Sequence, residues 1–108
     1  MNNSNFRSIT ATELEAMLQQ GGLRLLDVRM DTEILLHGRI PQGDPLPLHL
    51  VPVRLHELDS SAPTAFYCRM GGRSAQAAAF AAANGFSDVY NLQGGLAAWV
   101  QAGLPVST

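Results

Sequence analysis

The segment from Ala65 to Ala78 places the only cysteine of the chain between apolar residues and two glycines. Cys68 follows the run AFY, and the four residues RMGG separate it from Arg73. Glycines adopt backbone conformations that a β-carbon disfavours, so a tight loop here can aim several N–H groups at the sulfur. A helix beginning after the loop and nearby arginines also stabilise a thiolate. The segment therefore predicts a reactive thiolate in an anion-binding loop, in place of an ordinary buried cysteine.

Several kinds of cysteine chemistry do not fit the rest of the chain. A thiol protease needs a histidine base beside the sulfur, and none of His37, His49 and His56 falls plainly near the loop. One cysteine and three scattered histidines also lack the spacing of metal ligands, so we expect no metal site. Two reactions remain open. The thiolate either attacks a phosphate ester or accepts a sulfane sulfur as a persulfide, which a second nucleophile then removes.

The predicted site consists of the nucleophile, a loop and a supporting rim. The substrate-binding loop comprises Arg69, Met70, Gly71, Gly72, Arg73 and Ser74. The expected rim comprises Asp27, Arg29 and Arg39. For Asp27 and Arg29 we favour a structural ion pair, with Glu33 as a further member, since charges at strand ends often fix loops. We expect the Ser74 hydroxyl to support the start of the helix.

Composition limits the classes of function. The 108 residues are 46% apolar, which suits one domain with one modest core. Nine acidic residues against seven arginines give a net charge of −2, so we expect neither a nucleic-acid partner nor a membrane surface. The opening MNNSNFRS lacks the features of a secretory signal, and one cysteine forms no internal disulfide. We therefore expect a cytoplasmic monomer.

Strands alternate with helices along the chain, which predicts a parallel sheet covered on both faces. We expect a disordered tail over residues 1–7 and a single domain over 8–108. Strands are predicted at 8–10, 23–28, 63–68 and 88–92, with a very short one near 46–48. Helices are predicted from the Thr10–Glu13 capping box to Gly21, over 30–38 with Asp31 as cap, and over 72–85 and 94–103. Residues 50–61 are ambiguous, with a short helix that would hold Pro52 in its first turn.

These residues resemble those of a known family. CRMGGR resembles the C-x-x-G-x-R active-site loop of rhodanese-type sulfurtransferases, with Cys68, Gly71 and Arg73 at the marked positions. LLDVRMDTEILLHGRIPQG and VYNLQGGLAAWVQAGLPV resemble two further family segments, in the family's order. The resemblance spans about residues 8 to 107. It implies an α/β fold of the rhodanese/Cdc25-like type, with a five-stranded, mainly parallel sheet and helices on both faces.

The resemblance also implies an activity. Cys68 would carry the persulfide, and the loop amides with Arg73 would hold the sulfur and the donor anion. Arg69 would help to attract a small anionic donor such as thiosulfate. The acceptor would be thiophilic, namely cyanide in vitro and a thiol or a protein in vivo, and no cofactor is expected. Arg39 replaces the family's usual histidine and Gly72 lacks a side chain that would contact substrate, so the choice of donor stays open.

Two alternatives accompany this interpretation. Cdc25-like phosphatases share the fold but have a loop one residue longer, and they usually carry histidine where this chain has Tyr67. A smaller ring of amides suits a sulfur atom better than a tetrahedral phosphate, and no carboxylic general acid is evident. The second alternative is a non-catalytic or sulfur-carrier module that acts with protein partners. Degenerate modules usually lose the nucleophile, whereas Cys68 is present.

Overall fold

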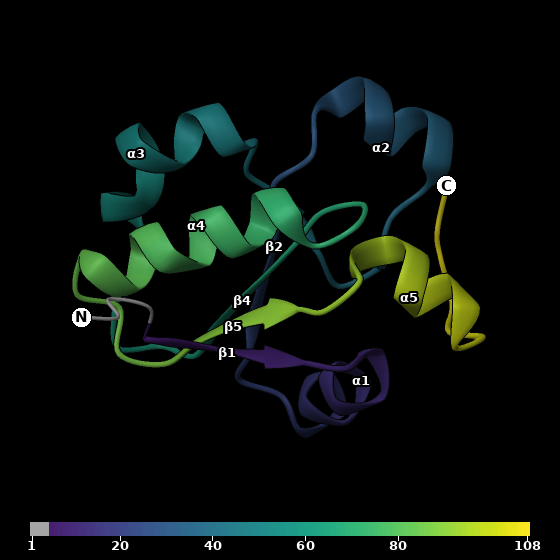
Figure 1. Ribbon diagram of the computed structural model, residues 1–108, viewed down its shortest axis with the longest axis horizontal. Coiled ribbons are helices and arrows are strands. Elements are labelled where there is room, and N and C mark those ends of the chain that lie inside the picture. Colours follow the sequence, from purple (N-terminus) through teal and green to yellow (C-terminus); the bar gives the residue numbers. More distant parts are fainter. Residues whose placement is uncertain (1–4) are drawn as a thin grey trace.

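The computed structural model describes residues 5–108, which form one sheet with helices on both sides (Figure 1). The strands are β1 (Phe6–Ile9), β2 (Arg24–Asp27), β3 (Asp44–Pro45), β4 (Thr64–Tyr67) and β5 (Val89–Leu92). The α-helices are α1 (Ala11–Gln20), α2 (Asp31–His37), α3 (Val51–Arg54), α4 (Gly72–Ala83) and α5 (Gly95–Gln101). Short 3-10 turns at Leu48–Leu50 and Leu55–Glu57 flank α3.

The strands follow the order β1-β5-β4-β2-β3, and every neighbouring pair is parallel. The carboxyl ends of all the strands therefore meet at one edge, where open parallel sheets bind ligands. β4 lies in the middle, and its four residues are all buried. This arrangement confirms the predicted fold class.

Alternate residues of the strands build two hydrophobic cores, one on each face. Phe66 faces α3 and α4 together with Ala77, Ala78 and Ala81, which are buried alanines of α4. Their small side chains let α4 lie close to the sheet. The other face is covered by α1 and α5 (Figure 1). Their side chains Leu14 and Trp99 are buried in the second core. Helices cover both faces of the sheet, as expected for strands whose sequences are continuous apolar runs.

Several predicted boundaries are wrong. β1 already begins at Phe6, where it pairs with Val89 of β5, so the tail predicted over 1–7 does not extend to Phe6 and Arg7. Residues 1–4 of that tail lie outside the described residues. The short strand expected near 46–48 lies instead at Asp44–Pro45, where two residues pair with the end of β2.

The helix starts also need correction. The cap of α2 is Met30 and not Asp31, since the Met30 backbone N–H donates to Glu33 Oε1 at 3.1 Å. The ambiguous stretch 50–61 forms α3 over four residues with Pro52 in its first turn, and then a 3-10 turn. The predicted Thr10–Glu13 capping box of α1 is confirmed.

No helix within residues 5–108 has the length and apolar character needed to cross a bilayer.

A buried ion pair ties the end of β2 to the end of α2. Asp27 and Arg29 are 1% and 0% exposed, and Arg29 Nη2 and Nε donate to the two carboxylate oxygens at 2.7 and 2.9 Å. Arg29 Nη2 also donates to the Gly38 carbonyl at 2.9 Å. The expected structural pair is therefore present, but Glu33 is not a member of it.

We predict that Asp27→Asn lowers the free energy of unfolding by about 3–5 kcal/mol, because it leaves the buried Arg29 charge without its counter-ion. Urea denaturation followed by circular dichroism measures this loss. Arg54→Ala is the control, since Arg54 pairs with Glu57 at the surface and its removal costs at most about 1 kcal/mol. Equal losses in the two variants would contradict a structural role for the buried pair.

Candidate active site

Cys68 directly follows β4, at the carboxyl edge of the sheet, and a tight loop leads from it into α4. The turn depends on Gly71, which caps α4 with φ +104°, a conformation that other residues adopt only with strain. A β-carbon there would also lie 3.2 Å from the Gly94 nitrogen. Gly72 differs, because a β-carbon there would meet nothing within 4 Å. The loop geometry therefore requires glycine at position 71 and leaves position 72 free of this constraint.

Three hydrogen-bond donors surround the Cys68 sulfur, which belongs to a residue only 1% exposed. The backbone nitrogens of Gly71 and Ser74 lie 3.1 and 3.4 Å from Sγ, and Ser74 Oγ lies at 3.3 Å. Burial raises the pKa of the thiol, but hydrogen bonds from Ser74, Gly71 and Met70 outweigh it and bring the pKa below its ordinary value. The site is therefore built to hold a thiolate.

The start of α5 holds the loop from the opposite side. The Leu96 and Ala97 backbone N–H groups donate to the Cys68 and Arg69 carbonyls at 2.8 and 3.1 Å. This contact needs Gly95, where φ is +59° and a β-carbon would lie 2.5 Å from the Cys68 carbonyl oxygen. Gly95 is therefore needed for the contact between α5 and the cysteine loop.

Asn91 is a site residue that the sequence reasoning missed. It lies on β5 and is buried. Its Oδ1 lies 2.6 Å from Ser74 Oγ and competes with the Cys68 sulfur for the single hydroxyl proton, while its Nδ2 donates to the Gly71 carbonyl at 3.3 Å. Asn91 therefore fixes both residues that donate to the sulfur. The signal in the sequence was an amide side chain inside the apolar strand VYNL, where a buried polar group needs partners.

Arg73 lies beside the sulfur but binds Glu33, which the sequence reasoning did not place in the site. Arg73 Nη1 and Nη2 donate to the two Glu33 oxygens at 2.6 and 2.8 Å, a bidentate pair that joins α2 to α4. This pair, with the Met30 N–H, lowers the Glu33 pKa from 4.5 to about 2. Both terminal nitrogens of Arg73 thus face Glu33 in this structure, although its charge remains near Cys68.

The other predicted residues divide into two groups. Arg69 and Met70 are exposed at the loop tip, with Arg69 Nη1 3.5 Å from His37 Nε2. Arg69 borders a hollow of about 350 Å³ that is also lined by His37, Leu96, Ala97 and Val100. Asp27 and Arg29 are buried and present no surface to a substrate, while exposed Arg39 pairs through its backbone with Ser107.

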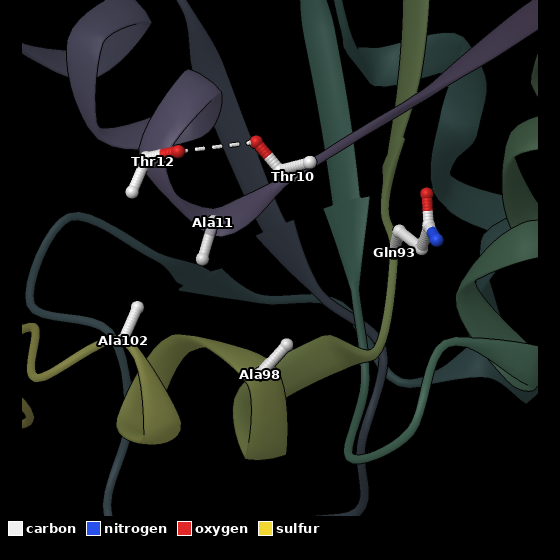
Figure 2. Close-up of a pocket in the computed structure, with 6 residues that line it drawn as sticks. All are labelled: Thr10, Ala11, Thr12, Gln93, Ala98 and Ala102. Atoms are coloured by element: carbon white, nitrogen blue, oxygen red, sulfur yellow. Dashed lines mark hydrogen bonds between the residues drawn. The ribbon is translucent and has the colours of Figure 1, made fainter.

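A second hollow, of about 300 Å³, lies between α1 and α5 and is shown in Figure 2. It is lined by Thr10, Ala11, Thr12, Gln93, Ala98 and Ala102. None of these side chains is a nucleophilic thiol or a titratable group, so this hollow offers no chemistry comparable to that at Cys68. Within residues 5–108 there is also no group of three metal-ligating side chains.

Comparison with known proteins finds relatives over most of the chain. The sequence model of the rhodanese-like domain matches residues 10–102. A sulfurtransferase from Allochromatium vinosum is 43% identical over 82 residues, which are 76% of each chain. Thiosulfate sulfurtransferase GlpE from Pseudomonas syringae is 33% identical over 89% of each chain. A Rhodopseudomonas palustris protein, described as of unknown function and a possible tyrosine phosphatase, has a similar structure with a TM-score of 0.85, 27% identity, and coverage of 96% of this chain and 86% of its own.

We predict that Ser74→Ala raises the pKa of Cys68, because the thiolate loses the hydroxyl 3.3 Å from its sulfur. The rate of alkylation by iodoacetamide, measured against pH, reports this pKa, and its midpoint should move to higher pH. Ser87→Ala changes an exposed serine and should leave the midpoint in place. An unshifted midpoint in Ser74→Ala would remove the hydroxyl from the set of stabilising donors.

We also predict that Glu33→Gln destabilises the fold at neutral pH by about 1 kcal/mol, because Arg73 loses its charged partner. The folded-state pKa of Glu33 is depressed from 4.5 to about 2, so the contribution is fully present above 4.5 and is lost as pH falls towards 2. The stability difference between the parent and the variant should therefore shrink across that window. Glu57→Gln, at an exposed pair, is the control, and a pH-independent difference would contradict the assignment.

Proposed function

The chain belongs to the rhodanese-like domain family, and from this we propose that it is a sulfurtransferase which moves a sulfane sulfur from a thiosulfate-like anion to a thiophilic acceptor through a persulfide on Cys68. The observation that carries the proposal is the ring of donors around Sγ, formed by Gly71 N, Ser74 N and Ser74 Oγ. Relatives named sulfurtransferase and thiosulfate sulfurtransferase support the same reaction class.

In the first half-reaction the Cys68 thiolate attacks the outer sulfur of the donor. For thiosulfate, the S–S bond of the donor breaks, sulfite leaves with the bonding electron pair, and Cys68 becomes a persulfide anion. Exposed Arg69 lies at the mouth of the loop and attracts the dianion. The loop N–H groups, which stabilise the thiolate, then hold the persulfide that replaces it.

In the second half-reaction the acceptor attacks the outer sulfur of the persulfide. The S–S bond to Cys68 breaks, and Cys68 leaves as the thiolate that the Gly71 and Ser74 N–H groups stabilise. With cyanide the product is thiocyanate. The same donors therefore serve both half-reactions, since they increase the fraction of Cys68 present as thiolate in the first and stabilise the thiolate as the leaving group in the second.

Phosphate-ester hydrolysis fits the site less well. A phosphatase of this kind needs a carboxylic acid to protonate the leaving oxygen. Glu33, the carboxylate nearest to the loop in the hydrogen-bond network, has a pKa of about 2 and is ionised at neutral pH. Asp27 is held by Arg29 in the buried pair. Neither carboxylate is available as a general acid.

Intact-mass measurement tests the proposal. We expect thiosulfate to add one sulfur atom to the protein, cyanide to remove it as thiocyanate, and Cys68→Ser to remain unmodified. Parallel assays with mercaptopyruvate and p-nitrophenyl phosphate separate the donor classes. Absence of an adduct in the parent protein, or an adduct that persists in Cys68→Ser, would contradict the assignment. Phosphate release that depends on Cys68, without an adduct, would favour a phosphatase.

A further inference from the structure

Large apolar side chains remain exposed on the segments that surround Cys68. They are Met30, Leu35, Leu36, Met70 and Val100. Leu35 is 83% exposed, Leu36 76% and Met70 67%. Single exposed apolar residues are ordinary, but several gathered around a nucleophile mark a surface that another molecule covers. In residues 5–108 the other exposed large apolar side chains, Val53 and Phe80, lie apart from this set on α3 and α4.

The segments that carry these side chains form one continuous surface. Arg69 of the loop approaches His37 at the end of α2, and the Arg69 carbonyl accepts a hydrogen bond from Ala97 of α5. His37, Arg69 and Val100 line the same hollow of about 350 Å³. In Figure 1 the loop before α4 projects towards α2 and α5. We call this surface, made of α2, loop residues 69–70 and α5, the active face.

The charge of the active face differs from that of the chain as a whole. Exposed Arg69 and Arg39 lie on it or beside it, and Glu33 is paired with Arg73, so Asp31 is the other acidic residue of α2. The chain nevertheless carries a net charge of −2. Most of its acidic residues belong to other segments, namely Glu13, Glu15, Asp44, Glu57, Asp59 and Asp88. An acidic surface therefore complements the active face.

We propose that the active face docks an acceptor protein that presents a cysteine on a projecting segment, with apolar side chains beside the cysteine and acidic residues around them. This proposal rests on the proposed sulfurtransferase function and names its acceptor class. A second copy of the chain is a poorer occupant. A two-fold interface would pair the active face with itself and so bring together two surfaces of the same charge.

The burial of Cys68 favours an acceptor whose cysteine lies on a segment that projects from its surface. Cys68 is 1% exposed, so an acceptor sulfur has to enter between the loop and the surrounding helices. The acceptor thiolate attacks the outer sulfur of the Cys68 persulfide, the S–S bond to Cys68 breaks, and Cys68 leaves as a thiolate. The acceptor gains the sulfur as its own persulfide, and no oxidant or reductant is needed. Apolar contacts on Leu35 and Leu36 would hold the segment during this exchange.

Two synthetic peptides test the proposal with the full-length protein loaded by thiosulfate. Both carry a Leu-Cys-Leu centre, flanked in one by aspartates and in the other by lysines. Transfer of sulfur to each peptide is followed by mass spectrometry. We expect the aspartate peptide to accept sulfur about tenfold faster, with the advantage shrinking at high salt. The double variant Leu35→Ser, Leu36→Ser should lower that rate about tenfold, because the apolar contact is lost.

Two controls separate docking from chemistry. Val53→Ser removes an exposed apolar side chain of α3, and we expect it to leave both peptide rates unchanged. Discharge by cyanide should be the same in the parent and in the double variant. Equal rates for the two peptides, or a double variant that transfers as fast as the parent, would overturn the docking proposal. Dimerisation in sedimentation that the double variant abolishes would assign the face to a second copy instead. If thiosulfate loads no sulfur, both proposals fail before any peptide is added.

Discussion

The structure depends on placing hydrogen-bond donors around the Cys68 sulfur at a position that water barely reaches. Cys68 is 1% exposed, so the protein itself has to supply the dipoles that water would otherwise provide. Backbone N–H groups of Gly71 and Ser74 do this, together with the start of α4. The left-handed conformation of Gly71 turns these groups inward, and that conformation accounts for the glycine at this position.

The loop keeps this shape because each of its sides is bound to a different element. Asn91 of β5 holds the Gly71 carbonyl and the Ser74 hydroxyl from below, and the α5 N-terminus holds the Cys68 and Arg69 carbonyls. Glu33 of α2 holds Arg73 from the third side. The parallel sheet brings these elements to one edge, so the fold supplies rigidity where the proposed reaction needs preorganised donors.

Two ion pairs near the site have different consequences. Asp27 and Arg29 are buried, and Arg29 donates to the Gly38 carbonyl after α2. The pair therefore has a structural role, since it connects the end of β2 to the end of α2. Glu33 and Arg73 are partly exposed, and their pair fixes the loop with the Arg73 guanidinium near Cys68. With Arg73 paired to Glu33, Arg69 is the arginine of the loop that is exposed to solvent. The two arginines of the loop therefore differ in role, because Arg73 fixes the loop and Arg69 stays exposed.

Local signals in the sequence were sufficient for the main strands and for the tight loop that follows Cys68. Apolar runs bounded by turn residues predicted the four main strands, and the cysteine, glycine pair and arginine predicted an anion-binding loop, because both depend on short-range chemistry. Short edge elements were predicted less well. β3 consists of two residues, and its position depends on pairing with β2, which lies far from it in sequence.

The partners of the loop were decided by tertiary structure alone. Asn91 and Glu33 are 17 and 40 residues away from Ser74 and Arg73, so the residues next to them in the sequence do not show which side chains they contact. The sequence suggested Arg73 for the donor anion, whereas folding places a carboxylate against it. The residue types of a thiolate loop can thus be recognised along the chain, but the groups that tune its charge come from strands and helices that only the fold brings together.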